Sequence, residues 1–326
     1  MPRTVTIKRI AWNICKWLAP ALAITYLWSE GMFSGETLSL AESAKAAVPA
    51  SVLFVCISTA LMVLRLHCLL RRLGCPSTIR AQASIAFPGL LAQQIGSEVA
   101  FDLMRFLGAK KQGGKPHDIL AALFMDRLLG MVSLTAVTAF GLALVWKGND
   151  WIFAVGVTVL VSVAVPVGLW LWQFAFERFP VLRKMPGAGF VESLGKSMWA
   201  LRRAGILLIG LFLLSVGVQL AFLGALYCCS HAFVHAVVSP DEALAAGALS
   251  SFTTAVPFPM AGLGIGEAAF GEVVVRMRES GNAADFAPVF LLNRVVVLGV
   301  GIVSWIVVLC TGGRPPDHNA ALKDAQ

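Results

Sequence analysis

Polar and charged side chains inside apolar stretches are the residues of this sequence with the clearest capacity for chemistry. Seven of them fall in two groups that are far apart along the chain. They are Glu98, Arg105, Asp126, Arg127, Glu267, Asn293 and Arg294. A charged side chain that faces lipid costs several kcal/mol, so we expect these residues to face protein or a water-filled cavity. Arginine binds carboxylates and phosphates bidentately, which makes both groups candidate contacts for a polar headgroup.

The same charges also have a structural interpretation. Pairs such as Glu98–Arg127 and Glu267–Arg294 would neutralise each other inside the protein. Asp102 lies one helical turn after Glu98 and adds a further carboxylate to the same face. Both interpretations can hold together, because a transporter can exchange an internal ion pair for a ligand. A buried carboxylate could also bind an amine or a proton, since burial raises its pKa.

Proline and glycine precede both glutamates, Glu98 and Glu267. Proline removes a backbone donor and ends helices, whereas glycine adopts the positive φ of a tight turn. The two helix-break motifs comprise Pro88 and Gly96 in the first case, and Pro257, Pro259, Gly262, Gly264 and Gly266 in the second. We expect the three glycines to form a turn with positive φ and Glu267 to open a new helix. A helix broken at membrane depth is buried in protein or lines a cavity, as in transporters, although a structural kink is the alternative.

The elements that carry these residues are predicted to be membrane helices. Of 326 residues, 58% are hydrophobic and 13% are charged, too few charges to cover a soluble protein of this size. Apolar runs of about 20 residues, enough to cross a bilayer, recur along the chain. They occupy 10–29, 48–70, 118–146, 151–175, 204–229 and 285–311. Two further segments, 82–108 and 242–279, are interrupted by Pro, Gly and charged residues and are expected to form re-entrant helical hairpins.

The predicted fold class is an all-α polytopic membrane protein with about six full transmembrane helices and two re-entrant, broken hairpins in an inverted repeat. Both interrupted segments contain Ile-Gly followed by Glu-x-x-Phe, and an Asp-Arg or Asn-Arg pair follows each at nearly equal spacing. The repeats cover about 48–146 and 204–311 of a single membrane domain, 1–326, with a short tail at 312–326. Basic clusters in the short loops place both termini in the cytoplasm.

Several other classes of function find no support in the sequence. It has no P-loop, His-Glu-x-x-His, Gly-x-Ser-x-Gly or dinucleotide-binding fingerprint. The formal charge of +8 comes from clusters beside apolar spans, where they meet anionic lipid, and not from a stripe typical of nucleic-acid binding. Cys228, His231 and His235 offer three metal ligands without a fourth nearby. We therefore expect no enzymatic activity, no cofactor, no metal and no nucleic-acid partner.

Taken together, these motifs resemble the membrane domain of the lysylphosphatidylglycerol synthase/flippase family over about 48–311. The residues that carry the resemblance are Pro88, Gly96, Glu98, Arg105, Asp126, Arg127, Leu128, Gly130, Pro259, Gly262, Gly264, Gly266, Glu267, Asn293 and Arg294. In two-domain relatives a cytosolic domain aminoacylates phosphatidylglycerol and the membrane domain moves the product to the outer leaflet. The resemblance implies a stand-alone flippase-like protein without the synthase half. Asn293 stands where the first repeat has Asp126, so the two halves are not expected to be chemically equivalent.

The leading hypothesis is a flippase of the bacterial inner membrane that moves a phospho- or glycolipid between leaflets. A membrane lipid is the partner that this hypothesis implies, and a second copy of the chain or a lipid-biosynthetic enzyme would be further partners. Two alternatives stay open. One is a membrane-embedded enzyme that acts on a lipid headgroup, and the other is a non-transporting scaffold of a lipid-biosynthetic complex.

Overall fold

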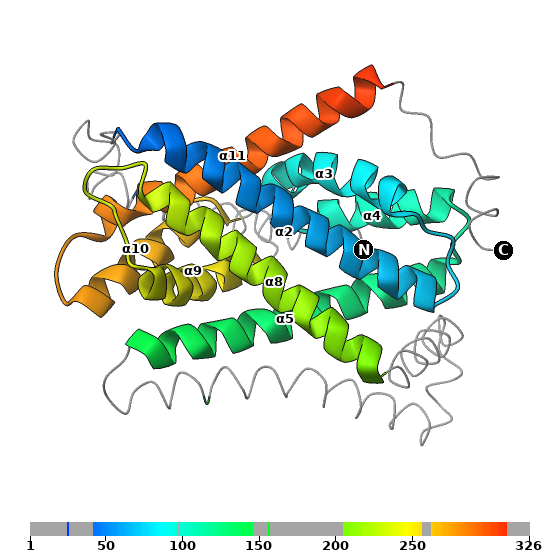
Figure 1. Ribbon diagram of the computed structural model, residues 1–326, viewed down its shortest axis with the longest axis horizontal. Coiled ribbons are helices and arrows are strands. Elements are labelled where there is room, and N and C mark those ends of the chain that lie inside the picture. Colours follow the sequence, from blue (N-terminus) through cyan, green and yellow to red (C-terminus); the bar gives the residue numbers. More distant parts are fainter. Residues whose placement is uncertain are drawn as a thin grey trace, which may run out of the picture. The chain divides into compact units, whose positions relative to one another are not determined.

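The structure is a computed structural model that describes residues 25, 42–96, 98–145, 156, 205–255 and 262–311. The described residues form α-helices, turns and a few irregular positions (Figure 1). The helices are α2 (Ala44–Arg72), α3 (Ile79–Gly96), α4 (Glu98–Lys111), α5 (Pro116–Val145), α8 (Gly205–Ser230), α9 (Pro240–Ala255), α10 (Ile265–Arg278) and α11 (Ala283–Cys310).

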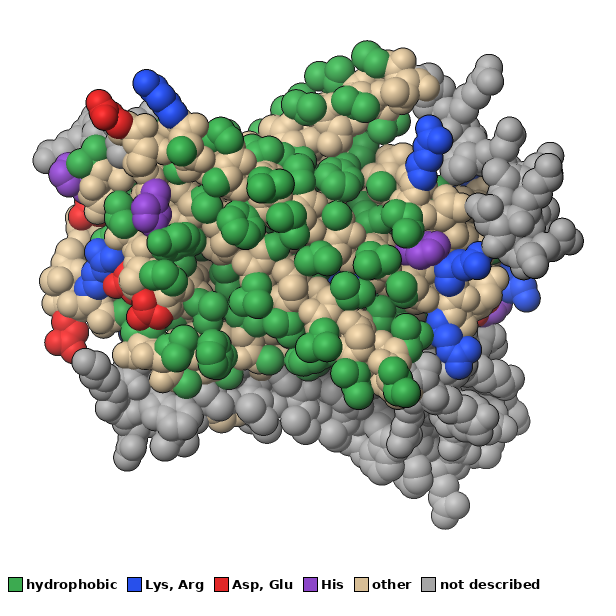
Figure 2. All heavy atoms as spheres, viewed as in Figure 1, with side chains coloured by type: hydrophobic (Ala, Val, Ile, Leu, Met, Phe, Trp, Pro, Cys, Tyr) green, Lys and Arg blue, Asp and Glu red, His purple; other side chains and the backbone are tan. Residues whose placement is uncertain are grey.

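Four of these helices are long and apolar enough to cross a membrane, namely α2, α5, α8 and α11. They coincide with the predicted spans at 48–70, 118–146, 204–229 and 285–311. Hydrophobic side chains cover the visible middle of the long helices α2 and α8 (Figure 2). This pattern suits lipid contact, because apolar side chains are more stable against hydrocarbon than against water. The predicted spans at 10–29 and 151–175 fall almost entirely outside the described residues.

Each interrupted segment forms two short helices rather than one long helix. The first consists of α3 and α4, which are separated by position 97, and the second of α9 and α10, which are separated by 256–264. The order long, short, short, long therefore occurs twice, once in α2–α5 and once in α8–α11. This order agrees with a repeat, while its inversion and the re-entrant course of the hairpins stay predictions.

The first helix break lies later than its proline suggests. Pro88 is inside α3, and the helix continues to Gly96. The missing N–H of a proline weakens a helix without ending it when the neighbouring turns remain bonded. Pro257 and Pro259 lie outside the described residues. The helix-break role assigned to Pro88 is therefore corrected: the break follows Gly96.

Glycines with positive φ end two of the helices. After α2, Gly74 has φ 75° and its N–H donates to the carbonyl of Arg71, while the N–H of Cys75 donates to Leu70. After α4, Gly113 has φ 93° and the same two bonds recur. This is the Schellman arrangement, which satisfies the last carbonyls of a helix and turns the chain sharply. Each turn is thus dictated locally by glycine.

Contacts divide the chain into two compact units. The first unit contains the described residues within 1–56, 89–101 and 222–303, and the second those within 57–88, 102–221 and 304–326. Most of the helices therefore contribute residues to both units.

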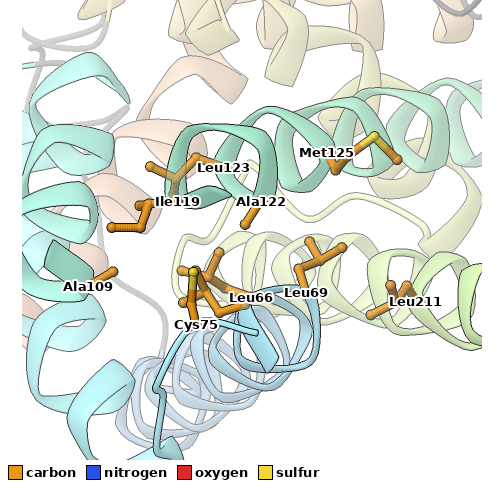
Figure 3. Close-up of a cluster of buried hydrophobic side chains, with 10 residues drawn as sticks. Leu66, Leu69, Cys75, Ala109, Ile119, Ala122, Leu123, Met125 and Leu211 are labelled. Atoms are coloured by element: carbon orange, nitrogen blue, oxygen red, sulfur yellow. The ribbon is translucent and has the colours of Figure 1, made fainter. Parts of the chain in front are cut away.

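The second unit has an apolar core built from α2, α4, α5 and α8. Its buried members are Leu66, Leu69, Leu70, Cys75, Ala109, Ile119, Ala122, Leu123, Met125 and Leu211 (Figure 3). The Schellman turn after α2 carries Cys75 back under Leu66 and Leu69, so the turn itself closes the core (Figure 3). This packing fixes the ends of α2 and α5 next to each other and so positions the charged residues described below.

In the first unit, small residues let helices approach closely. A Cβ added to Gly271 of α10 would lie 2.1 Å from the carbonyl oxygen of Ala283, and one added to Gly301 of α11 would lie 2.8 Å from the backbone nitrogen of Leu91. Both contacts are with backbone, which cannot move aside cheaply. Glycine is therefore required where α10 meets α11 and where α11 meets α3, as is typical of membrane helices.

Candidate functional site

Asp126 of α5 is the centre of a buried ion-pair network in the second unit. Its Oδ1 accepts a hydrogen bond from Nε of Arg65 at 2.6 Å, and its Oδ2 accepts one from Nη2 of Arg105 at 2.8 Å. Arg65 also donates to the hydroxyl of Ser215 at 2.9 Å. All three charged side chains are at most 5% exposed. Both oxygens of this carboxylate are therefore bound to buried guanidinium groups, and the network joins α2, α4 and α5.

Asp102 extends this network to Arg127. Its Oδ2 lies 2.7 Å from Nε of Arg127, and its Oδ1 lies 3.2 Å from Nη1 of Arg105. The side chain of Arg127 is 35% exposed, so this end of the network is the accessible one. The predicted partner of Arg127, Glu98, belongs to the first unit, and that pair stays a prediction.

The first unit contains a second buried pair, Glu267 with Arg294. Oε1 of Glu267 lies 2.6 Å from Nε of Arg294, as predicted from the sequence. The other carboxylate oxygen, Oε2, accepts the backbone N–H of Gly264 at 2.7 Å, which caps the start of α10. Arg294 also donates from Nη2 to the carbonyl of Gly262 at 3.3 Å. One ion pair therefore connects the helix break to α11.

The glycines before Glu267 have two different roles. Gly262 and Gly264 have φ 69° and 87°, as expected for a turn that only glycine adopts easily. Gly266 lies inside α10 and is not among the positive-φ glycines, which corrects the prediction for the third position. A Cβ there would lie 2.8 Å from the Phe290 ring and 3.0 Å from Nη2 of Arg294. Gly266 is therefore needed so that the guanidinium can lie close to the helix.

A small cavity in the first unit, lined by both polar and apolar side chains, adjoins this pair. It is lined by Gln93, Gln94, Glu98, Phe222, Phe290, Asn293, Arg294 and Val297. Its volume is about 50 Å³, which is room for a few water molecules. The side-chain amide of Gln93 donates a hydrogen bond to Oε1 of Glu98, so these two residues are oriented toward each other across the break after α3. Carboxamides, a carboxylate and a guanidinium thus converge on one small volume.

Asn293 is a predicted site residue that also belongs to this lining. Its side chain is buried, with 1% of the residue exposed, yet Oδ1 has no hydrogen-bond partner among the described residues. A buried carbonyl oxygen without a partner costs about 1–3 kcal/mol. Such groups are rare in folded proteins and are concentrated where a ligand or water binds. Asn293 is therefore a lining residue with an unused hydrogen-bond acceptor.

The charged networks and the cavity lie in a region of the chain that matches a known protein family. The family described as lysylphosphatidylglycerol synthase TM region matches residues 16–309. The chain belongs to this family. In this member, the matched region contains both charged networks and the cavity, and it extends the resemblance that the sequence motifs suggested. A comparison with curated proteins finds no match.

The structure brings the predicted site residues together in two sets. Glu98, Glu267, Asn293 and Arg294 belong to the first unit, and all but Glu267 line the cavity. Arg105, Asp126 and Arg127 belong to the second unit and form its ion-pair network.

Three further residues were missed by the sequence analysis: Arg65, Gln93 and Gln94. A charge in the middle of the apolar span 48–70 and two carboxamides in the interrupted segment 82–108 were the available signals.

Proposed function

We propose that this protein moves a lipid with a polar headgroup between the leaflets of a bacterial inner membrane. The observation that carries the proposal is the cavity, with charged and carboxamide side chains in its lining, beside the buried Glu267–Arg294 pair in a multi-pass membrane protein of this family. Polar side chains at membrane depth are costly and are retained at substrate pathways. The headgroup would bind in the cavity while the acyl chains remain in the bilayer.

Arg294 has the central role in this proposal. Its guanidinium reaches the cavity while Glu267 balances its charge, so a phosphate could share the guanidinium without creating an unpaired buried charge. Glu98, which accepts a hydrogen bond from Gln93, supplies a second charge to the lining. Both termini would lie in the cytoplasm.

The test is translocation in proteoliposomes that contain trace NBD-acyl-labelled phosphatidylglycerol or monoglucosyl diacylglycerol. Dithionite bleaches only the outer leaflet, so about half of the signal is lost when lipid does not cross. We expect a larger loss with the wild-type protein and a return toward half with Arg294→Ala. Runs with and without a proton gradient show whether transport is driven by protons.

Arg278→Ala is the matched control. Arg278 also pairs with a glutamate in the first unit, Glu242, but it does not line the cavity. Transport by this variant should stay within about twofold of wild type. Equal rates for wild type, Arg294→Ala and protein-free vesicles with every lipid tested would refute the proposed function.

We further infer that the lipid is moved without chemical change. Mass spectrometry of each lipid after incubation with the protein in detergent, where leaflets do not exist, tests this directly. A new product that depends on Glu98 or Asp126 would favour the membrane-embedded enzyme. Normal growth of cells whose only copy carries the Arg294→Ala change would favour a scaffold.

A further inference from the structure

The two repeats place different chemistry at the same pair of positions. The residue seven places after the repeat glutamate is Arg105 in the first repeat and Val274 in the second. The residue before the repeat arginine is Asp126 in the first and Asn293 in the second. The second repeat thus lacks both members of the Arg105–Asp126 ion pair. Loss of the cation and loss of the anion go together, so the second repeat carries no uncompensated charge at these positions.

The equivalent residues Asp126 and Asn293 differ in their hydrogen bonding. Both oxygens of Asp126 are bound by arginines at 2.6 and 2.8 Å. Val274 is fully buried and offers no donor to its surroundings, and the Oδ1 of Asn293 has no partner among the described residues. In the first repeat, Asp126 joins α5 to α2 and α4 through ion pairs. The second repeat leaves a neutral, buried acceptor in Asn293, which is one of the residues of the cavity lining.

Beside the charged Glu98 and Arg294, the carboxamides of the lining are suited to a neutral group that both donates and accepts hydrogen bonds. Asn293, Gln93 and Gln94 bring three carboxamides to one cavity, each with an acceptor oxygen and an N–H₂ donor. An ammonium group could pair with Glu98, but it only donates and would give the amide donors no acceptor. A phosphate diester could pair with Arg294, but it only accepts and would give the Oδ1 of Asn293 no donor. A hydroxyl does both, and it also reproduces the hydrogen bonds of the water that it displaces.

We propose that the cavity recognises a hydroxyl group of the lipid headgroup, and that Asn293 is the specificity-determining contact because its Oδ1 accepts the hydroxyl proton. The ligand class is a lipid with a polyol or sugar headgroup. This inference rests on the proposed function and names its substrate class. The volume of about 50 Å³ suits one or two hydroxyl groups at the tip of a headgroup, rather than a whole saccharide.

The experiment compares four lipids with identical acyl chains on the purified full-length protein by native mass spectrometry. Phosphatidylglycerol has hydroxyls and a phosphate, and monoglucosyl diacylglycerol has hydroxyls alone. Phosphatidylethanolamine has an ammonium and a phosphate, and phosphatidic acid a phosphate alone. The protein is kept in an amine-oxide detergent, because glucoside and maltoside detergents would compete. We expect both hydroxyl-bearing lipids to bind about three- to tenfold more tightly than the other two, as one hydrogen bond implies.

Asn293→Leu provides the decisive variant, because leucine keeps the branching and removes the acceptor. It should reduce binding of the two hydroxyl-bearing lipids to the level of the others. Asn282→Ala is the control, because Asn282 lies outside the cavity and its Oδ1 accepts the N–H of Ala284 at 3.0 Å at the start of α11. Preferential binding of phosphatidylethanolamine or phosphatidic acid, or a preference that survives in Asn293→Leu, would overturn the proposal.

Stability gives a second readout that a structural role of Asn293 would not produce. Removing a buried acceptor without a partner should leave the apparent Tm of the lipid-free protein unchanged or raised, whereas Asn282→Ala should lower it by a few degrees through loss of a helix cap. A fall in Asn293→Leu as large as in Asn282→Ala would assign Asn293 to structure and overturn the proposal.

Methyl glucoside, which carries the hydroxyls without acyl chains, distinguishes binding of a soluble sugar from binding of a lipid. Stabilisation by millimolar methyl glucoside alone would assign the cavity to a soluble polyol and overturn the lipid part of the proposal. Failure of the hydroxyl preference while dithionite-detected translocation persists would refute this inference and leave the proposed function intact. Failure of translocation with every lipid would refute the proposed function itself.

Discussion

Oε1 of Glu267 and Nε of Arg294 lie 2.6 Å apart, with the two side chains 1% and 9% exposed. The same glutamate caps α10 through Gly264, so the pair connects a helix terminus to the middle of α11. A carboxylate that serves as cap and as counter-ion at once holds the broken hairpin in a defined place. The cavity beside it therefore has one rigid wall.

The Glu267–Arg294 pair is expected to be non-additive in a double-mutant cycle. Glu267→Gln leaves the guanidinium buried without its counter-ion and should destabilise the protein by about 3–5 kcal/mol. Arg294→Gln alone leaves the carboxylate unpaired and should cost a similar amount. The double variant should lose much less than the sum, because both charges are then absent. Thermal unfolding in one detergent measures all three, and additive losses would show that the pair is not energetically coupled.

The same Asp→Asn substitution should reduce folding stability more at the buried Asp126 than at the partly exposed Asp102. Asp126→Asn removes a 2% exposed carboxylate from two arginines and should cost about 3–5 kcal/mol. Asp102→Asn changes a side chain that is 27% exposed and should cost about 1 kcal/mol or less. Unfolding of the two variants under identical conditions checks this difference. Equal losses would mean that exposure does not decide the contribution of this network.

Two glycine substitutions should have opposite signs. Gly271→Ala places a Cβ 2.1 Å from the carbonyl oxygen of Ala283 and should destabilise the protein by about 1–3 kcal/mol, because backbone must move. At Gly299 of α11 no atom lies within 4 Å of the added Cβ. Gly299→Ala should therefore be neutral or stabilise by about 0.5–1 kcal/mol through helix propensity. A destabilised Gly299→Ala variant would contradict the packing described for α11.

The Glu242–Arg278 pair at the start of α9 should make stability depend on pH. Burial alone would raise the pKa of Glu242, but hydrogen bonds from Arg278 and Ser239 outweigh it and hold the pKa below its ordinary value. A carboxyl group whose pKa is lowered on folding stabilises the protein above its unfolded-state pKa. That stability is lost as the pH falls through the folded-state value. The apparent Tm should therefore fall below about pH 4.5, and more steeply than in Glu242→Gln. Identical profiles of apparent Tm against pH for the wild type and Glu242→Gln would show that Glu242 does not cause the loss of stability at low pH.

The sequence by itself determined the helical membrane architecture and which two segments are interrupted, although the first break follows Gly96 and not Pro88. The apolar runs at 48–70, 118–146, 204–229 and 285–311 correspond to α2, α5, α8 and α11. They were predictable because the length and composition of a run alone decide whether it can cross the hydrocarbon core. The glycine turn before Glu267 was also predictable, since Gly262 and Gly264 need no distant partner to adopt positive φ. Even the pair Glu267–Arg294 followed from two charges that each required a counter-ion.

Only the tertiary structure decided which charges pair with one another and which residues line a cavity. Asp126 pairs with Arg65 of α2, which lies far away along the chain and whose role depends on how α2 and α5 pack. Gln93 and Gln94 join Asn293 only because α3 and α11 approach through Gly301. Hydrogen-bond partners must lie within about 3 Å, and periodicity does not specify distances between helices to that precision. For this reason the sequence could place Asn293 in a span, but the packing alone showed that its carbonyl oxygen is buried without a described partner.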